Sequence, residues 1–417
     1  MQRIYQLSNF GVHFTSVSIE TKSVHNRNLK CLAQILSTFD RPIKLNHSMS
    51  SALFPYVPPF VAAVILFSRF FMDFGANLGL VDKPNERSSH TRTIPRVGGI
   101  AIFVPYLILG LILQLINAEL LTNSAAYWLG LAAIVVLGTV DDRLNLPSSI
   151  KFLIQFAVAS YYVLSSGTTL ITCTVSSVWR ITESLGISLS IITVVYVINA
   201  VNLIDGVDGL SAGTSLLSIG LLTTLMGGGE QYFSLAFIGL GLLVFMGFNY
   251  SEKRKIFLGD AGSLGLGFIL ATLAMEFLFS ENNHIADLNL NPVIVAILIL
   301  GYPIADTMRV FVIRLSMGVS PFTADRRHMH HVLLDKGFTH FGVTTFIMSV
   351  IAGFVLVNKF LAPRLDSHLM ILLNVGAMIL IHLFVRHRSM QLRIFWRSFS
   401  RSVFNPVKKV WNKYVAD

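Results

Sequence analysis

The sequence predicts an all-α, polytopic integral membrane protein. Of its 417 residues, 53% are hydrophobic and only 13% are charged, whereas about a quarter of the residues of a typical soluble domain are charged. The mean hydropathy is +0.65, and the chain contains about eleven separate apolar stretches, each able to cross a bilayer as a helix. These observations exclude an ordinary water-soluble fold.

The apolar stretches divide the chain into three parts. Residues 1–50 form a weakly patterned leader without the successive regions of a signal peptide, and Met49 is a candidate true start. Residues 51–386 are expected to form one transmembrane catalytic domain, and residues 387–417 a basic cytoplasmic tail. The eleven helices are expected near residues 55–72, 98–120, 125–140, 150–166, 187–204, 210–227, 232–249, 264–279, 292–315, 343–358 and 368–385.

The excess of basic residues is concentrated in the tail. The formal net charge is +10, and because much of this excess lies after residue 385, we expect no nucleic-acid partner. Residues 386–401 place arginines on one helical face and aromatic residues on the other, which is typical of an interfacial helix, although a simple positive-inside tail explains them equally well. Cys31 and Cys173 provide neither a disulfide framework nor metal-ligand spacing.

The connections between the stretches predict the orientation, because short cytoplasmic loops carry an excess of Lys and Arg. Alternate connections are basic, among them 83–96, 251–255 and 314–336, whereas the connections between them carry few bases. The basic set is therefore expected to face the cytoplasm. Every cluster of polar, titratable residues falls in that set, which indicates chemistry at one face of the membrane rather than a pore.

Two clusters of carboxylates follow apolar helices. Asp141 and Asp142 stand at the end of the third stretch, where a solvated helix end is the simpler interpretation of such a pair. Asn199, Asn202, Asp205 and Asp208 recur every three residues, so we expect them to line one drifting helical face. Ionisable groups at membrane depth are costly and usually functional, although a polar helix-packing seam is an alternative.

Two further clusters complete the candidate site. Asp260 lies in the segment Gly-Asp-Ala-Gly-Ser at the start of an apolar helix, whose free N–H groups favour phosphate, although the Asp also suits a simple helix cap. The segment 325–331 reads Asp-Arg-Arg-His-Met-His-His. It lacks the partner ligands of a zinc site, so its arginines and histidines are better explained as phosphate donors. Carboxylates without thiolates favour Mg²⁺ or Mn²⁺.

These motifs resemble, in order, those of the polyprenyl-phosphate N-acetylhexosamine-1-phosphate transferases, and most closely the bacterial undecaprenyl-phosphate N-acetylglucosamine-1-phosphate transferases. The resemblance covers residues 82–338 and also includes Asp-Lys-Pro-Asn at 82–85 and Pro-Arg-Val-Gly-Gly at 95–99. It implies an enzyme of the bacterial inner membrane with its active site facing the cytoplasm. Such an enzyme joins UDP-GlcNAc to undecaprenyl phosphate, giving undecaprenyl-diphospho-GlcNAc and UMP for O-antigen or common-antigen synthesis.

The resemblance also implies roles for individual residues. Asp260 and Asn202 would hold or approach Mg²⁺ or Mn²⁺ at the diphosphate, with Asp205 close to that site. Asp141, helped by Asp142, would orient or deprotonate the lipid phosphate. Because the second pKa of a phosphate monoester is near 6, positioning should matter more than proton removal.

The remaining assignments concern the sugar nucleotide. Asp208 resembles the family's residue on the nucleotide side. The expected substrate-binding residues are Lys83, Asn249, Arg326, His328, His330 and His331. Met329 replaces the usual isoleucine of the histidine motif, and no proline precedes the Gly-Asp motif as it does in many relatives.

Two alternatives remain open at this stage. A phospho-MurNAc-pentapeptide transferase shares most of the motifs, and a transporter would also carry intramembrane carboxylates, although it predicts polar groups at mid-depth and inverted repeats. The expected partners are UDP-GlcNAc, undecaprenyl phosphate and membrane lipid, and a homodimer is compatible with the sequence.

Overall fold

The computed structural model describes residues 53–84, 92–116, 124–170, 182–226, 233–279, 292–320, 326–361 and 364–387. The chain divides into two units, residues 1–45 and 46–417, and all described residues belong to the second. The expectations for the leader, for most of the tail and for the interfacial helix concern residues outside this set.

The described residues are mostly helical, as predicted. After a 3₁₀ turn η1 (Phe54–Tyr56), the elements are α3 (Val57–Phe74), β1 (Val81–Asp82), β2 (Ile94–Pro95), α4 (Gly98–Ile116), α5 (Ala125–Leu144), α6 (Ser148–Ser166), α7 (Glu183–Leu203), α8 (Leu210–Leu225), α9 (Phe233–Asn249), α10 (Gly259–Phe279), α11 (Pro292–Ile299), α12 (Gly301–Ser316), α13 (Met329–Asp335), α14 (His340–Leu361) and α15 (Ser367–His387). Each predicted apolar stretch coincides with a helix, and the stretch 292–315 is divided between α11 and α12.

The division of that stretch is a sharp bend. The axes of α11 and α12 differ by 75° across one intervening residue, Leu300. Among the described residues, seven helices are long and apolar enough to span a membrane, or eight if the bent pair counts as one span. Two other helices, α8 and α9, are apolar but shorter, so helix length and composition do not establish the predicted number of eleven crossings.

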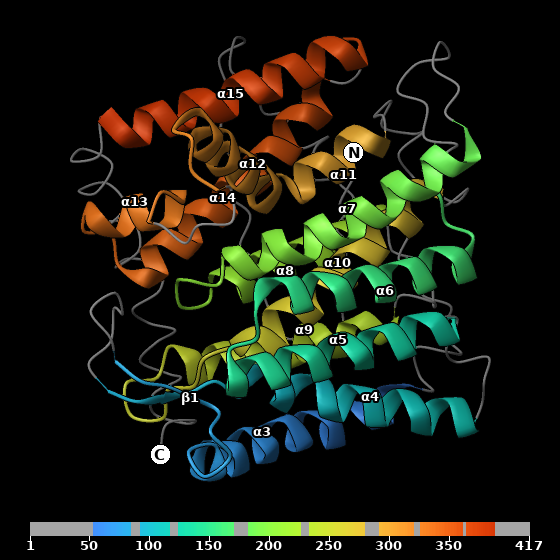
Figure 1. The fold of residues 1–417 in the computed structure, drawn as a ribbon, viewed down its shortest axis with the longest axis vertical. Helices are drawn as coiled ribbons and strands as arrows, with labels where there is room; N and C mark the ends of the chain where they lie inside the picture. The colour runs from blue at the N-terminus through green and yellow to red at the C-terminus, as the bar shows by residue number, and fades with distance from the viewer. Residues whose placement is uncertain are drawn as a thin grey trace, which may run out of the picture. The chain divides into compact units, whose positions relative to one another are not determined.

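Helix α10 is the centre of the bundle. It packs against α4, α5, α7, α8 and α11, and 89% of its apolar window is buried, compared with 11% for α15. An apolar helix that is buried on all sides suits such a central position. In Figure 1 the axes of α4, α5, α6 and α7 run in the same general direction, with α10 behind them.

Glycines allow the helices next to α10 to approach its first turn. A Cβ atom on Gly99 would lie 2.1 Å from the backbone nitrogen of Gly262, and one on Gly138 would lie 2.4 Å from that of Ala261. Contact this close is open only to residues without a side chain. As a result, α4 and α5 fix the position of the turn that carries Asp260.

The antiparallel strands β1 and β2 pair Val81 with Pro95 and Asp82 with Ile94. An isolated bridge joins Arg96 to Phe257, which ties the hairpin to the connection between α9 and α10. In Figure 1, β1 and α13 lie at the same end of the bundle. The candidate site forms at this end.

Candidate active site

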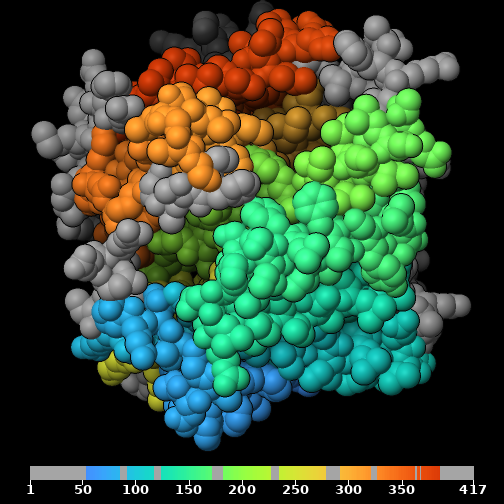
Figure 2. All heavy atoms as spheres, in the orientation of Figure 1, coloured from blue at the N-terminus to red at the C-terminus, as the bar shows by residue number. Residues whose placement is uncertain are grey.

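A cavity of about 460 Å³ lies at this end of the bundle. Its lining comes from five connections that are far apart in the sequence. The polar and charged members are Asp82, Arg96, Asp142, Asn202, Asp205, Asp208, Asn249, Asp260, Arg326, His331 and His340. Figure 2 shows the surface hollowed between the orange atoms of the segment around α12 and α13 and the blue atoms of the segment before residue 100.

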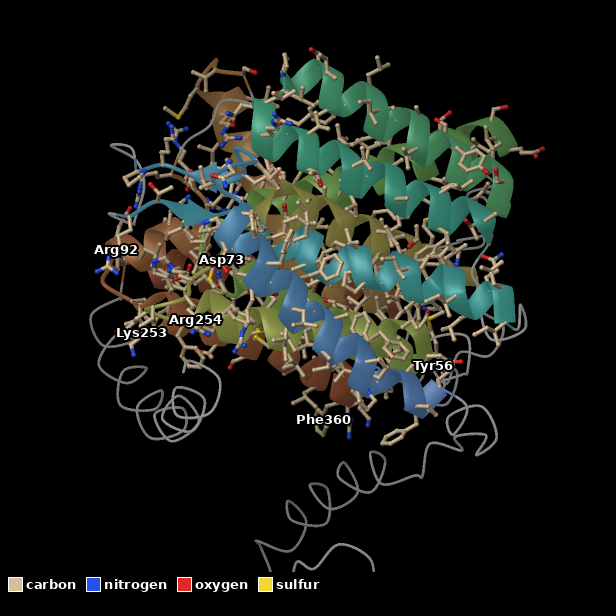
Figure 3. The ribbon with its side chains drawn as sticks, turned by 90° about the horizontal axis from the view of Figure 1, so that it is seen from below. Tyr56, Asp73, Arg92, Lys253, Arg254 and Phe360 are labelled. Atoms are coloured by element: carbon tan, nitrogen blue, oxygen red, sulfur yellow. The ribbon has the colours of Figure 1, made fainter. Side chains whose placement is uncertain are left out.

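All five connections belong to the alternate, basic set that the sequence predicted to share one face. Figure 3 shows Asp73, Arg92, Lys253 and Arg254 at one end of the molecule and Tyr56 at the other. The predicted polar clusters all contribute residues to one cavity, and their role as a catalytic site stays a prediction. The structure contains no membrane, and the compartment that this end faces stays a prediction.

The two adjacent aspartates of α5 have different partners. Asp142 accepts hydrogen bonds from the backbone N–H groups of Asp260, at 2.9 Å, and Ala261, at 3.0 Å, so its carboxylate caps the start of α10. Asp141 accepts bonds from the N–H of Leu146, at 2.8 Å, and from Nζ of Lys151, at 2.7 Å. Asp142 lines the cavity and Asp141 does not.

Asp260 lies in the first turn of α10, as predicted, and is oriented by α7. Nδ2 of Asn202 donates to Oδ1 of Asp260 at 2.7 Å and to Oγ of Ser263 at 2.8 Å. This contact joins two of the predicted motifs, which are 58 residues apart. Asn202 therefore acts on Asp260 through its amide nitrogen.

The prediction that four residues share one helical face is wrong. Helix α7 ends at Leu203, and the chain then turns through Gly209, whose φ is +70°. Asn199 donates instead to Oε1 of Gln155 on α6, at 2.5 Å, away from the cavity. Asp205 and Asp208 therefore lie in the turn between α7 and α8, which ends at Gly209, the N-cap of α8.

The carboxylates of this turn have opposite electrostatic environments. Burial raises the pKa of Asp205 well above its usual value, and the charges of Asp260, Asp142 and Asp208 raise it further. Burial would also raise the pKa of Asp208, but His340 and Lys255 outweigh it and lower that pKa. Lys255 Nζ lies 2.6 Å from Oδ2 of Asp208, and His340 Nδ1 lies 3.1 Å from it.

The chemistry of the donor set suits a hard divalent cation. The acidic wall of the cavity, formed by Asp142, Asn202, Asp205, Asp208 and Asp260, offers carboxylate and amide oxygens and no thiolate. Such a set of ligands matches Mg²⁺ or Mn²⁺. A cation would offset the repulsion that raises the pKa of Asp205. However, the described residues contain no group of three or more His, Cys, Asp or Glu side chains arranged to hold a metal, so such an ion would need further oxygen ligands from water or a substrate phosphate.

The histidine segment, residues 328–331, lies against the acidic turn, residues 204–209, which contains Asp205 and Asp208. A Cβ atom on Gly206 would lie 2.9 Å from Nε2 of His330 and 3.4 Å from Cε1 of His331. Burial is the main cause that lowers the pKa of both histidines, so both are neutral near pH 7. His331 lines the cavity, whereas His330 lies behind it, with none of its surface exposed.

The other predicted substrate-binding residues differ in position. Arg326 lines the cavity and pairs with Asp335 at 2.8 Å. Asn249 also lines it: its Nδ2 donates to the carbonyl of Ile256, and its buried Oδ1 has no partner among the described residues. Lys83 is exposed after β1 and is not part of the lining. His328 is buried outside the cavity.

Several cavity residues were not predicted as site residues. Asp82 and Arg96 form an ion pair of 2.6 Å across the hairpin. Both belong to sequence motifs of the family, and their charge is the feature that could have identified them. Lys255 does not line the cavity but pairs with Asp208, which does, and in the sequence it is one of several bases in a basic loop. His340 begins α14, and no local pattern distinguishes it, because only the fold brings it to Asp208.

Comparisons with known proteins show the family to which the chain is related. Residues 124–278 match the sequence profile of glycosyl transferase family 4. A Bacillus subtilis (strain 168) protein, named probable undecaprenyl-phosphate N-acetylglucosaminyl 1-phosphate transferase, is 33% identical over 286 residues, which cover 66% of this chain and 76% of that protein.

Two further relatives have similar names. The decaprenyl-phosphate N-acetylglucosaminephosphotransferase of Mycobacterium tuberculosis (strain ATCC 25618 / H37Rv) is 30% identical over 319 residues, 69% of this chain and 78% of its own. The undecaprenyl-phosphate alpha-N-acetylglucosaminyl 1-phosphate transferase of Escherichia coli (strain K12) is 28% identical over 296 residues, 66% and 76% of the two chains. The extent of these matches shows that the chain belongs to the polyprenyl-phosphate N-acetylhexosamine-1-phosphate transferases of glycosyl transferase family 4.

Proposed function

We propose that this protein transfers N-acetylglucosamine-1-phosphate from UDP-GlcNAc to undecaprenyl phosphate at the cytoplasmic face of a bacterial inner membrane. The products are undecaprenyl-diphospho-GlcNAc and UMP, and the reaction would be the first lipid-linked step of a cell-surface polysaccharide of the O-antigen or common-antigen type. The observation that carries the proposal is the convergence of Asp142, Asp205, Asp208 and Asp260 with Arg326 and His331 on one cavity.

The reaction is a displacement at phosphorus. An oxygen of the lipid phosphate attacks the β-phosphorus of UDP-GlcNAc, the bond from that phosphorus to the bridging oxygen breaks, and UMP leaves with the electron pair. We favour one in-line step over a covalent aspartyl-phosphate intermediate. Such transfer depends mainly on positioning and on electrostatic stabilisation of the phosphoryl oxygens.

Asp260 and Asp205 are the residues that would hold a divalent cation, with Asn202 orienting Asp260. When bound, Mg²⁺ or Mn²⁺ supplies positive charge to the diphosphate oxygens. Without it, the carboxylates of the cavity would repel the substrate. Arg326 and the neutral His331, which both line the cavity, would donate hydrogen bonds to the phosphate or the sugar.

The contacts of Asp141 bear on the proposed proton removal. Its carboxylate binds Lys151 and the N–H of Leu146 and also contacts the side chain of Asp260. Much of the lipid phosphate is already dianionic at pH 7 because its second pKa is near 6. We therefore assign Asp141 to the orientation of the acceptor side, through Lys151 and the start of α6, rather than to the transfer of a proton.

The direct test is the release of UMP by membranes that contain this protein. UMP should form from UDP-GlcNAc only when both undecaprenyl phosphate and Mg²⁺ or Mn²⁺ are supplied. Use of UDP-MurNAc-pentapeptide in place of UDP-GlcNAc would refute the proposed donor, and use of neither would refute the enzymatic function.

Substitution of one carboxylate tests the cation site. Asp260→Asn removes the charge but keeps the shape, so turnover should fall by at least about 100-fold while membrane insertion and the unfolding temperature persist. Glu183→Gln is the matched control, because Glu183 is exposed in the first turn of α7 and should leave turnover unchanged. Full activity of the Asp260 variant would reject the assignment.

A further inference from the structure

A buried carboxylate lies behind the histidine segment, outside the cavity. Asp306 belongs to α12, and only 4% of its surface is exposed. Its Oδ2 lies 2.9 Å from Nδ1 of His328, and its Oδ1 accepts a hydrogen bond of 2.7 Å from Nη2 of Arg309. The backbone N–H of Met329 lies 3.1 Å and 3.2 Å from the two carboxylate oxygens. One carboxylate therefore binds two side chains and the first residue of α13.

The contact with Asp306 determines which ring nitrogen of His328 carries a proton. A carboxylate only accepts hydrogen bonds, so Nδ1 of His328 carries the proton. The side chain of His328 is 5% exposed, and its Nε2 is buried without a partner in the described part of the chain. Because His328 is absent from the cavity lining, its role is to be held by α12 rather than to meet a ligand.

The other two histidines continue from His328 toward the cavity. The rings of His328 and His330 are stacked, with centroids 5.6 Å apart and planes 14° apart, and the ring of His331 lies 4.3 Å from that of His330. His330 and His331 both face Gly206, next to Asp205. The three imidazoles thus connect the buried carboxylate of α12 with the acidic turn after α7.

A second contact also attaches the histidine segment to α12, and we call this attachment the anchor. Nη2 of Arg309, which pairs with Asp306, also donates to the backbone carbonyl of Arg327 at 2.7 Å. The pair of Asp306 and Arg309 therefore binds the chain immediately before and immediately after His328. This brackets the entry of the segment into α13.

We infer that Asp306 is a positioning residue for the transfer reaction. It docks residues 328–331 onto α12, so that His331 keeps its place in the cavity wall and His330 keeps its contact with Gly206. The inference rests on the proposed function, because His331 is taken to act on the substrate, and it assigns His328 to the anchor instead of the substrate-binding group.

The first experiment compares Asp306→Asn with Thr307→Val. The Asn variant keeps the volume and removes the charge, whereas Thr307 is an equally buried neighbour whose hydroxyl has no partner among the described residues. We expect kcat to fall about 10- to 100-fold in Asp306→Asn, by analogy with carboxylates that orient metal-binding histidines, while KM for undecaprenyl phosphate stays within about twofold. Thr307→Val should match the wild type in both.

Hydrogen exchange gives a readout that does not depend on activity. Asp306→Asn should speed amide exchange in residues 329–335 and leave the first turn of α10 unchanged. If wild-type protein releases no UMP, the proposed function fails, but the exchange result still judges the anchor. Unchanged exchange in 329–335 would overturn the inference even if turnover fell.

The second experiment replaces His328 itself. It tests the contact between His328 and Asp306 even if the Asp306 variant is not recovered from membranes. The amide nitrogen of Asn takes the place of Nδ1 and can still donate to Asp306, whereas that of Gln takes the place of Nε2. His328→Asn should retain several times more activity than His328→Gln, and Asp306→Asn should add little to His328→Gln, since both remove one contact. Greater activity of the Gln variant, or fully multiplicative losses, would refute the anchor.

Discussion

Asp205 and Asp208 lie three residues apart in one turn, yet their surroundings shift their pKa values in opposite directions. Burial and three neighbouring carboxylates raise the pKa of Asp205, whereas Lys255 and His340 lower that of Asp208 against the effect of burial. Such a divergence is a feature of sites in which two carboxylates have different tasks. The lowered pKa favours the charged form of Asp208, whereas the raised pKa of Asp205 favours its neutral form, and a nearby cation would favour its charged form.

The pH dependence of the reaction should report this difference. Lys255→Met removes a cation that favours the charged form of Asp208, so the pKa of Asp208 should rise and the acid limb of kcat/KM should move to higher pH. In the wild type, the ion pair of Lys255 and Asp208 stabilises the fold above the pKa of Asp in the unfolded chain, about 3.9. This stabilisation is lost as the pH falls through the lowered pKa of Asp208 in the folded protein. The variant should therefore lose about 1 kcal/mol at pH 7, and less in acid.

Activity profiles and thermal unfolding in detergent between pH 2 and pH 8 measure both effects. Lys253→Met is the control, because Lys253 is exposed in the same connection and does not line the cavity. An acid limb that stays in place in Lys255→Met would contradict the assigned pairing.

Among the elements, α10 unites the fold with the site. Its buried body forms the centre of the bundle, and its first turn carries Asp260. That turn is held on three sides: Asp142 caps its N–H groups, Asn202 binds the carboxylate, and Gly99 and Gly138 pack on its backbone. The position of Asp260 therefore depends on residues of α4, α5 and α7.

A single methyl group at this contact should disturb both stability and activity. Gly138→Ala places Cβ 2.4 Å from the nitrogen of Ala261, and the backbone of α10 can relieve the overlap only by moving. Overpacking of this kind typically costs about 1–3 kcal/mol, and the displaced Asp260 should lower turnover as well. Gly353→Ala in α14, where a Cβ meets nothing within 4 Å, should be neutral in both thermal unfolding and UMP release. Equal behaviour of the two variants would contradict the close approach.

The elements also show what the sequence could and could not predict. Apolar length is a local property, so every predicted stretch coincides with a helix. The bend at Leu300 and the non-helical turn after Leu203 escaped prediction, because the bend interrupts a continuously apolar run and the turn was obscured by a three-residue repeat of polar side chains. Asp306 had a usable signal, as a carboxylate inside an apolar helix.

The partners of the site residues were beyond sequence reasoning for a different reason. That Asp142 caps α10, or that His340 meets Asp208 across 132 residues, follows from how helices pack, and no local pattern encodes it. The sequence could predict that the clusters share one face, because successive membrane crossings place alternate connections on the same side. This alternation predicts the face on which each connection lies, but it does not predict which residues contact one another.

At the scale of the whole molecule, the polar residues of the cavity are confined to one end of an apolar bundle. This asymmetry predicts the outcome of labelling in intact cells. In a background with Cys31 and Cys173 replaced by Ser, a cysteine at Lys253 should react with a membrane-impermeant maleimide only after the membrane is opened. A cysteine at Phe54, which is 69% exposed next to Tyr56 at the other end (Figure 3), should react in intact cells. The reverse pattern would place the site outside the cytoplasm.

The cavity also has a pharmacological consequence. Its volume of about 460 Å³ falls within the 300–1,000 Å³ that accommodate drug-sized molecules, but its acidic wall penalises neutral, greasy compounds. An inhibitor that carries its own ammonium or amidine group would satisfy that wall directly, without competing for an inorganic ion. Screening for such cationic scaffolds is therefore a more promising route than copying the sugar nucleotide.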